Sequence, residues 1–381
     1  MRELMAANNT LLQLRHRIDA IDSEVLTLLN ARAQCAEEVA IAKKAELDKE
    51  LADLANKEGK TEKQEVCFYR PEREAQILHR MVEENKGPLR DEQVTKIYRD
   101  IISSCLALEE CLKIAYLGPA GTFTQKATHK HFGDWVETLP QESISNVFQE
   151  VEVGRAHYGV VPIENSTGGI VSHTLDRFIK SPLYICGEIQ LPIHQNLLSL
   201  SRDWQSVTQV YSHQQSLTQC QNWLKSNLPN ALLTAVASNA EAAKMASNDA
   251  NCAAISSIEA AEIYQVPVIQ QRIEDLANNT TRFIVIAKHD NLPSGYDKTS
   301  LLISAKNQSG ALFALLKPLA KYGLDMSRIE SRPSQSTNWE YVFFLDIDGH
   351  AQDSNVQAAL AELEQQADLL RILGSYPVAI Q

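Results

Sequence analysis

Lys113-Ile114-Ala115-Tyr116-Leu117-Gly118-Pro119-Ala120-Gly121-Thr122-Phe123 decides the fold of the middle of the chain. The apolar run predicts a short buried strand, and the small residues after it predict a loop that leads into a helix. Further strand-like runs follow, separated by helical stretches, at 158–163, 183–189, 253–255 and 283–287. This alternation predicts a mixed, largely parallel α/β sheet.

The residues before this stretch have the pattern of helices. Apolar residues recur every three or four positions from Leu11 to Leu29, and no Gly or Pro occurs in residues 1–56. This predicts one very long first helix. Charged residues then dominate an insertion at about 44–66, which is typical of a solvated helical extension or a loop.

Two shorter helices are expected after the insertion. Pro71 stands where a helix begins, and the turn at 85–88 ends that helix. A third helix spans about 91–111. One chain can hardly cover the apolar faces of three such helices, so we expect a helical dimer.

The last 84 residues form a separate compact unit. A strand at 300–305 and a helix at 311–322 precede strands at 325–330 and 341–347, a second helix and a closing strand near 372–374. This βαββαβ order predicts a ferredoxin-like sandwich. The predicted domains are therefore 1–111, 112–290 and 298–381.

The composition excludes several classes of protein. The chain has 381 residues, 44% of them hydrophobic, and a net charge of −12, which argues against nucleic-acid or membrane-surface binding. No apolar run is long enough to span a membrane, and the N-terminus lacks a signal-peptide core. Seven scattered cysteines without a CxxC pair indicate reduced thiols and a cytoplasmic protein. No nucleotide motif or metal-ligand spacing occurs, so we expect no cofactor and no metal.

Three cations stand out on the first helix. Arg32 and Lys43 are eleven residues apart and share one helical face. Arg15 precedes Arg32 by 17 residues, roughly 25 Å along a helix, so one small ligand contacts both only if Arg15 comes from a second subunit. The alternative is that all three are solvated surface charges.

Four segments in this region resemble the all-helical chorismate mutases: residues 14–19, 28–32, 41–43 and 69–74. The resemblance implies rearrangement of chorismate to prephenate by a site that grips two carboxylates and donates hydrogen bonds to the ether oxygen. It assigns the carboxylates to Arg15 of the partner chain, Arg32 and Arg73, the ether oxygen to Lys43, and the ring hydroxyl to Glu74. Glu109 stands where some members have glutamine, and a carboxyl group donates a hydrogen bond only when protonated.

In the middle domain, residues 118–124 form a loop of small residues at the start of a helix, which is a generic anion site. The polar segments 162–169, 211–215 and 279–283 could each be an ordinary turn. Together they resemble prephenate dehydratase, which implies a two-lobed α/β domain of periplasmic-binding-protein type with the site between its lobes.

The resemblance also assigns residues to the dehydratase site. Thr281 is the expected proton donor or its positioner, Arg282 a carboxylate partner, and Glu164 a member of the proton network. A threonine hydroxyl is a poor acid, so its proton must come through such a network. His213 is expected to be structural. The other substrate-binding residues are expected to be Thr122, Asn165, Ser166, Ser212, Gln215 and Phe283.

Two segments of the last domain resemble the ACT domain found behind prephenate dehydratases. They are Gly310-Ala311-Leu312, with Asn307 just before, and Glu330-Ser331-Arg332. The resemblance implies that these residues bind phenylalanine as a feedback inhibitor, although Arg332 could instead form a surface ion pair.

The whole chain thus resembles a bifunctional chorismate mutase–prephenate dehydratase of phenylalanine synthesis, acting as a homodimer or a dimer of dimers. Two alternatives remain open. One is a ligand-binding regulator with the same folds and no catalysis, and the other is a dehydratase whose mutase is inactive. A dehydrogenase fusion is disfavoured because the dinucleotide fingerprint is missing.

Overall fold

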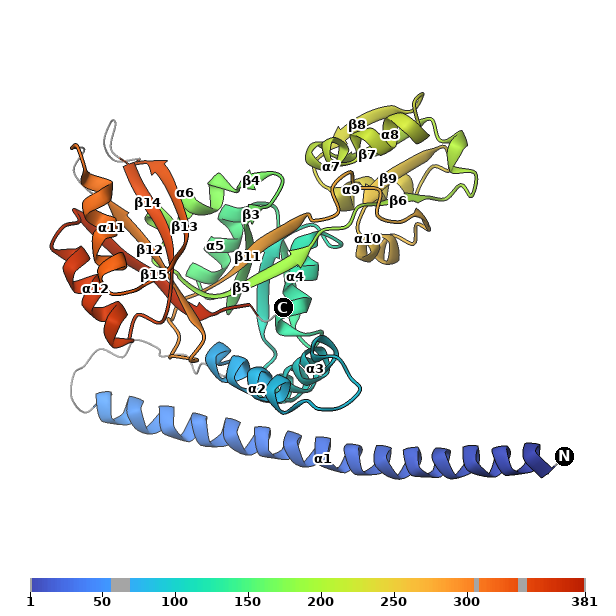
Figure 1. Ribbon diagram of the computed structural model, residues 1–381, viewed down its shortest axis with the longest axis horizontal. Coiled ribbons are helices and arrows are strands. Elements are labelled where there is room, and N and C mark those ends of the chain that lie inside the picture. The colour runs from blue at the N-terminus through green and yellow to red at the C-terminus, as the bar shows by residue number, and fades with distance from the viewer. Residues whose placement is uncertain (1, 56–68, 305–307, 335–340, 380–381) are drawn as a thin grey trace.

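The computed structural model describes residues 2–55, 69–304, 308–334 and 341–379 (Figure 1). Three helices come first: α1 (Arg2–Ala55), α2 (Pro71–Glu84) and α3 (Asp91–Glu109). The first part of the charged insertion continues α1 to Ala55, and residues 56–66 of it lie outside the described residues. No helix among the described residues has the length and apolar content to cross a membrane.

Helix α1 runs along one side of the molecule and packs only its second half against α3 (Figure 1). Its first half has an uncovered apolar face, because large side chains at helical spacing are solvent-exposed there. These are Leu11, Leu14, Ile18, Ile21, Val25 and Leu28. Such a face is unfavourable in water unless a partner covers it.

A first α/β lobe follows, with strand order β2-β1-β3-β11-β5 and the short β4 beside β3. β1 is parallel to β2 and β3, whereas β11 is antiparallel to both β3 and β5. Helix α4 covers one face of the sheet, and α5 and α6 cover the other. The elements are β1 (Lys113–Leu117), α4 (Phe123–Phe132), β2 (Glu137–Gln141), α5 (Ile144–Glu152), β3 (Tyr158–Asn165), β4 (Gly169–Ile170), α6 (Ser172–Lys180), β5 (Tyr184–Pro192) and β11 (Thr280–Ala287).

The second lobe is inserted between β5 and β11, so the chain crosses between the lobes twice (Figure 1). Its strand order is β10-β6-β9-β7-β8, with β7 parallel to β8 and β9. The elements are β6 (Asn196–Ser199), β7 (Gln209–His213), α7 (Gln214–Gln219), α8 (Gln221–Asn227), β8 (Leu232–Val236), α9 (Asn239–Ala246), β9 (Cys252–Ser256), α10 (Ile258–Ile263) and β10 (Val268–Gln270).

The C-terminal unit is an antiparallel sheet of order β13-β14-β12-β15 with two helices. Leu301, Leu315 and Leu363 belong to the core between this sheet and its helices. The elements are β12 (Asp297–Ser304), α11 (Ala311–Lys321), β13 (Met326–Pro333), β14 (Tyr341–Asp348), α12 (Ser354–Glu364) and β15 (Leu369–Pro377).

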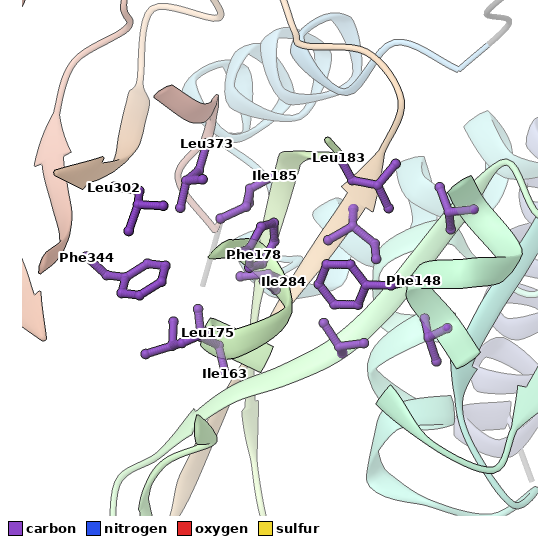
Figure 2. Close-up of a cluster of buried hydrophobic side chains, with 14 of the residues drawn as sticks. Phe148, Ile163, Leu175, Phe178, Leu183, Ile185, Ile284, Leu302, Phe344 and Leu373 are labelled. Atoms are coloured by element: carbon purple, nitrogen blue, oxygen red, sulfur yellow. The ribbon is translucent and has the colours of Figure 1, made fainter. Parts of the chain in front are cut away.

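The other face of this sheet shares a core with the first lobe. Leu302, Phe344 and Leu373 pack with Ile185 and Ile284 in one buried cluster (Figure 2). Burial of such side chains stabilises each by roughly 1.5–3 kcal/mol relative to exposure, so this shared core stabilises the contact between the two units.

Gly374 marks the closest approach of the two sheets. Its φ is +145°, and a Cβ added there would lie 2.8 Å from the main-chain nitrogen of Ile185 and closer still to its carbonyl oxygen. Because these are backbone atoms, no side-chain movement could make room. Only glycine fits where β15 crosses β5.

Candidate active sites

The two lobes enclose a cavity of about 800 Å³. The first lobe contributes the loop after β1, the end of β3 and the start of β11, and the second contributes α7 and the start of α9. Of the expected dehydratase residues, Thr122, Asn165, Gln215, Thr281 and Phe283 line this cavity. The chain therefore brings together residues that are up to about 160 positions apart in the sequence.

Asn165 is the centre of the hydrogen-bond network in the cavity. Its Nδ2 donates to Thr281 Oγ1 and to Asn279 Oδ1, both at 2.8 Å. Its Oδ1 accepts from the Gly168 amide at 2.7 Å and from Gln215 Nε2 at 3.1 Å. Asn165 is buried and its amide group is fully bonded, so its orientation is fixed.

This network determines what the Thr281 hydroxyl can do. Because Thr281 Oγ1 accepts a hydrogen bond from Asn165, its own proton is left to point elsewhere. Among the described residues, that proton has no protein acceptor, and Thr281 faces the cavity. The hydroxyl can therefore donate to a molecule bound between the lobes.

Several residues of the network were missed in the sequence. Asn279 Nδ2 donates to Gln219 Oε1 at 3.1 Å, and Gln219 Nε2 donates to Thr167 Oγ1 at 2.8 Å. Spacing could have identified two of them, because Asn279 is two residues before Thr281, next to the start of β11, and Gln219 is four residues after Gln215 on α7.

In the second lobe, Asn239 has a similar role. Its Nδ2 donates to Ser216 Oγ at 2.9 Å, and its Oδ1 accepts from the Ser212 hydroxyl at 2.9 Å and from the His213 amide at 3.0 Å. Ser212 is fully buried behind Asn239 and supports it without lining the cavity. Ser166 also does not line the cavity, since it bonds the main chain at Asn278 and Thr280.

The charged side chains that line the cavity are acidic. Its described lining contains no Lys or Arg, and its charged side chains are Glu142 and Glu241. Two helices begin at the cavity, α4 capped by Thr122 and α9 capped by Ser238. Their free N–H groups, together with amide side chains, can bind carboxylate oxygens without a fixed cation.

Arg282 and Glu164 are turned away from the cavity, contrary to expectation. Strand residues alternate in direction, so the neighbours of Thr281 and Asn165 point to the other face of the sheet. Arg282 donates from Nε to Glu188 at 2.8 Å and from Nη1 to Asp346 at 2.6 Å, which leaves it unavailable as a substrate carboxylate partner. Glu164 lies beside Arg328 of the C-terminal unit.

In the helical region, three of the expected residues lie close together. Lys43 Nζ is 3.7 Å from Glu109 Oε2, and Arg32 Nη1 donates to the Ile101 carbonyl oxygen at 3.5 Å. Burial raises the pKa of Glu109, and the positive charges of Lys43 and Arg32 offset part of that rise. The group thus combines two cations with a carboxyl group that holds its proton more strongly than usual.

The other expected mutase residues lie elsewhere in the single chain. Arg15 is exposed on the free half of α1, and Arg73 is exposed on α2. Glu74 is buried and accepts from Arg99 Nε at 3.2 Å, in a small cavity that also includes Tyr69 and excludes Lys43 and Glu109. Burial raises the pKa of Glu74, and Arg99 opposes that rise. Glu74 of α2 is therefore not part of the group around Glu109.

In the C-terminal unit, Gly310 has a left-handed conformation with φ of +81° just before α11, which explains a glycine there. Ala311 and Leu312 open the helix, and Glu330 and Ser331 lie on β13. Arg332 forms an ion pair with Asp176 at 3.0 Å and donates to Ser172 Oγ at 3.0 Å, so the alternative of an ion pair holds. Asn307 lies outside the described residues.

Comparisons with known proteins find three protein families along the chain. A prephenate dehydratase family model matches residues 114–291, a chorismate mutase type II model matches 14–110, and an ACT domain model matches 299–365. The solved prephenate dehydratase from Arthrobacter aurescens in complex with L-Phe is 33% identical, with a TM-score of 0.65 over 70% of this chain and 90% of that one. The prephenate dehydratase from Staphylococcus aureus is 27% identical, with a TM-score of 0.62 over 70% of this chain and all of that one.

Two lobes around a polar cleft, preceded by a helical unit and followed by an ACT domain, define a regulated two-site enzyme. The bifunctional chorismate mutase/prephenate dehydratase of Pseudomonas aeruginosa is 45% identical over 377 residues, covering 99% of this chain and all of that protein. The one from Neisseria gonorrhoeae is 46% identical over 369 residues, covering 96% of each. The chain belongs to this family of bifunctional chorismate mutase/prephenate dehydratases.

Proposed function

We propose that Thr281 and Asn165 act on prephenate in the cleft. Formation of phenylpyruvate breaks two bonds of prephenate: the ring carboxylate leaves as carbon dioxide, its electron pair enters the ring, and the ring hydroxyl leaves as water. The departing hydroxyl needs a proton, and Thr281 presents a hydrogen-bond donor to it while Asn165 holds Thr281 in place. This Asn165–Thr281 contact is the observation that carries the proposal.

The carboxylates of prephenate are assigned to the N–H groups at the starts of α4 and α9. Thr122 and Ser238 cap these helices, and Gln215 and Asn239 provide further amide groups at the cavity. Oriented dipoles of this kind are already in place before the substrate arrives, so they cost little reorganisation when charge moves during the reaction.

The mutase centre is proposed to form around Arg32, Lys43 and Glu109, with Arg15 supplied by a second copy of the chain. Arg32 grips a carboxylate of chorismate, and Lys43 and protonated Glu109 donate to the ether oxygen. The exposed apolar face on the first half of α1 supports an intertwined dimer, because the residues around Arg15 have no cover within one chain. Arg73 is free to take part, whereas Glu74 is engaged by Arg99.

We further propose that phenylalanine binds the ACT domain and slows the dehydratase. The Arthrobacter aurescens enzyme was solved with L-Phe, and it resembles 70% of this chain. The binding residues would be Gly310, Ala311, Leu312, Glu330 and Ser331, while Arg332 connects the domain to α6. We assign the enzyme to the cytoplasm, since none of the six cysteines of the described residues forms a disulfide.

The purified chain, given chorismate without added cofactor, tests this function. We expect prephenate to appear first and phenylpyruvate to follow, with phenylalanine slowing the second step. If prephenate accumulates and no phenylpyruvate forms, the cleft binds a ligand without catalysis. Absence of chorismate turnover would remove the mutase assignment, and a prephenate feed would then show whether the dehydratase exists.

The mutase is expected to lose activity as pH rises through the raised pKa of Glu109. Below that pKa the carboxyl group is protonated and donates to the ether oxygen, and above it the carboxylate cannot donate. Activity should fall by about tenfold per pH unit once Glu109 is mostly ionised. Glu109→Gln should remove this fall, because an amide donates at every pH.

The pH profile of the mutase, measured from chorismate consumption, decides this prediction. Glu110→Gln is a matched control, since Glu110 is the next residue and lies near His157 instead. An unchanged profile in Glu109→Gln would show that another group causes the pH dependence.

A further inference from the structure

The paired strands β3 and β11 carry two adjacent pairs of residues with opposite directions. Asn165 is opposite Thr281, and both side chains meet at the cleft. Glu164 is opposite Arg282, and both side chains point to the C-terminal unit. A single peptide unit on each strand therefore separates the catalytic pair from a pair in contact with the regulatory domain.

Arg282 is the centre of a buried polar cluster between the domains. Its three nitrogens donate to Glu188, to Asp346 at 2.6 Å and to the Tyr376 hydroxyl at 2.9 Å. Asp346 also accepts from the Ser300 hydroxyl at 2.5 Å. Asp346 and Tyr376 belong to β14 and β15 of the C-terminal unit, so the guanidinium of Arg282 binds that unit directly to the strand of Thr281.

The charges of this cluster hold one another in place. Burial opposes ionisation of Asp346, yet Arg282, Ser300 and Arg328 keep its pKa below the usual value. Lys298 of β12 adds a contact to Glu188 at 3.2 Å. Since an unpaired buried charge is strongly unfavourable, the C-terminal sheet cannot move relative to β11 without carrying Arg282 along.

Glu164 has a looser contact to the same unit. Arg328 Nε lies 3.4 Å from Glu164 Oε2, and the Arg328 side chain is 10% exposed. Its Nε and Nη2 atoms have no hydrogen-bond partner among the described residues. This incompletely bonded guanidinium is the part of the interface that a small shift of β13 could tighten or break.

We propose that Arg282 and Glu164 are positioning residues that transmit the state of the ACT domain to Thr281 and Asn165. Phenylalanine then changes the geometry of the catalytic pair through β11 and β3. It lowers dehydratase kcat more than it changes KM, because the substrate carboxylates are held by other elements. This inference rests on the proposed function, namely on dehydratase activity and its inhibition by phenylalanine.

Two variants test this transmission and leave Arg282 and its buried carboxylate partners unchanged. Glu164→Gln keeps the shape of the side chain and removes its charge opposite Arg328. Tyr376→Phe removes one hydrogen bond to Arg282 and keeps the ring in the core. In both, we expect the inhibition of dehydratase kcat by saturating phenylalanine to weaken by at least about fivefold, the lower end of ordinary allosteric coupling. Phenylalanine should still bind, as measured by calorimetry on the full chain.

A double-mutant cycle sharpens the test. Glu164→Gln and Arg328→Met should each weaken inhibition by phenylalanine. The double variant should lose no more inhibition than the single variant with the larger loss, since both changes remove the same contact between Glu164 and Arg328. Lys321→Met is the control, because it breaks an exposed ion pair with Glu362 inside the ACT domain. It should leave basal activity and inhibition unchanged.

Three results would overturn the inference: inhibition like that of the wild type in Glu164→Gln and Tyr376→Phe, additive effects in the cycle, or loss of phenylalanine binding in these variants. A merely structural role would lower the melting temperature and alter KM as well as kcat. If the wild type itself lacks dehydratase activity or a response to phenylalanine, the proposed function fails, and that outcome is distinct.

Discussion

Thr281→Ala is expected to lose dehydratase activity by about 10²- to 10⁴-fold in kcat, the usual contribution of a positioned proton donor. The change removes the only atom of the side chain that can donate to the departing hydroxyl. Asn165 would still donate to Asn279, and one lost hydrogen bond of this kind costs about 1 kcal/mol of stability, so the fold should persist. Mutase activity of the same chain should remain, because Thr281 lies in the cleft and not among the helices.

Conversion of prephenate to phenylpyruvate, followed by absorbance, measures the effect. Thr281→Ser restores a hydroxyl at the same position and should recover much of the activity. Thr280→Ala is the matched control, since Thr280 lines a different cavity. Equal losses in Thr280→Ala and Thr281→Ala would mean that the start of β11 is sensitive to any change, and the role of the hydroxyl would be refuted.

Arg32→Ala should have the reverse effect, with mutase activity lower by about 10²- to 10³-fold and dehydratase activity intact. A guanidinium that binds a carboxylate by paired hydrogen bonds cannot be replaced by solvent in the same geometry. Chorismate consumption measures the loss, and a prephenate feed measures the retained activity. Arg80→Ala, which removes an exposed arginine of α2, should leave both activities unchanged.

Mixed dimers test whether Arg15 comes from the second subunit. Arg15→Ala and Arg32→Ala homodimers should both be inactive as mutases. A mixed dimer of the two should regain one intact centre, since one of its two sites would contain both wild-type arginines. Mixtures without recovered activity would contradict a shared site, and loss of both activities in Arg32→Ala would indicate misfolding.

The sequence was sufficient to predict a cleft residue when the residue belongs to a motif and its side chain is on the strand face that points to the cleft. Thr281 and Asn165 were found from their motifs, and the structure brings them within 2.8 Å. Arg282 and Glu164 were misplaced because a resemblance of consecutive residues gives their order along the chain and not the face of the strand. Successive side chains of a strand point to opposite faces, so Thr281 and Arg282 cannot both face the cleft.

Helix ranges were also predictable, but their packing partners were not. The proline at position 71 and the turn at 85–88 predicted the two ends of α2, which the structure has at Pro71 and Glu84. The periodic pattern does not tell whether Glu74 faces α1 or the dehydratase domain, because periodicity shows which side of a helix is buried and not which neighbour covers it. Edge strand β2 has exposed and charged residues such as Glu137, and it lacks the apolar run by which buried strands are recognised.

Gly374 gives a way to sort related sequences before any of them is solved. Any other residue at this position would force β15 away from Ile185, and the cluster around Arg282 would be pulled apart with it. A relative that keeps glycine there can dock its two sheets as this chain does. A relative with a larger residue must hold its last domain differently, so its sensitivity to the end product must depend on other contacts or be lost.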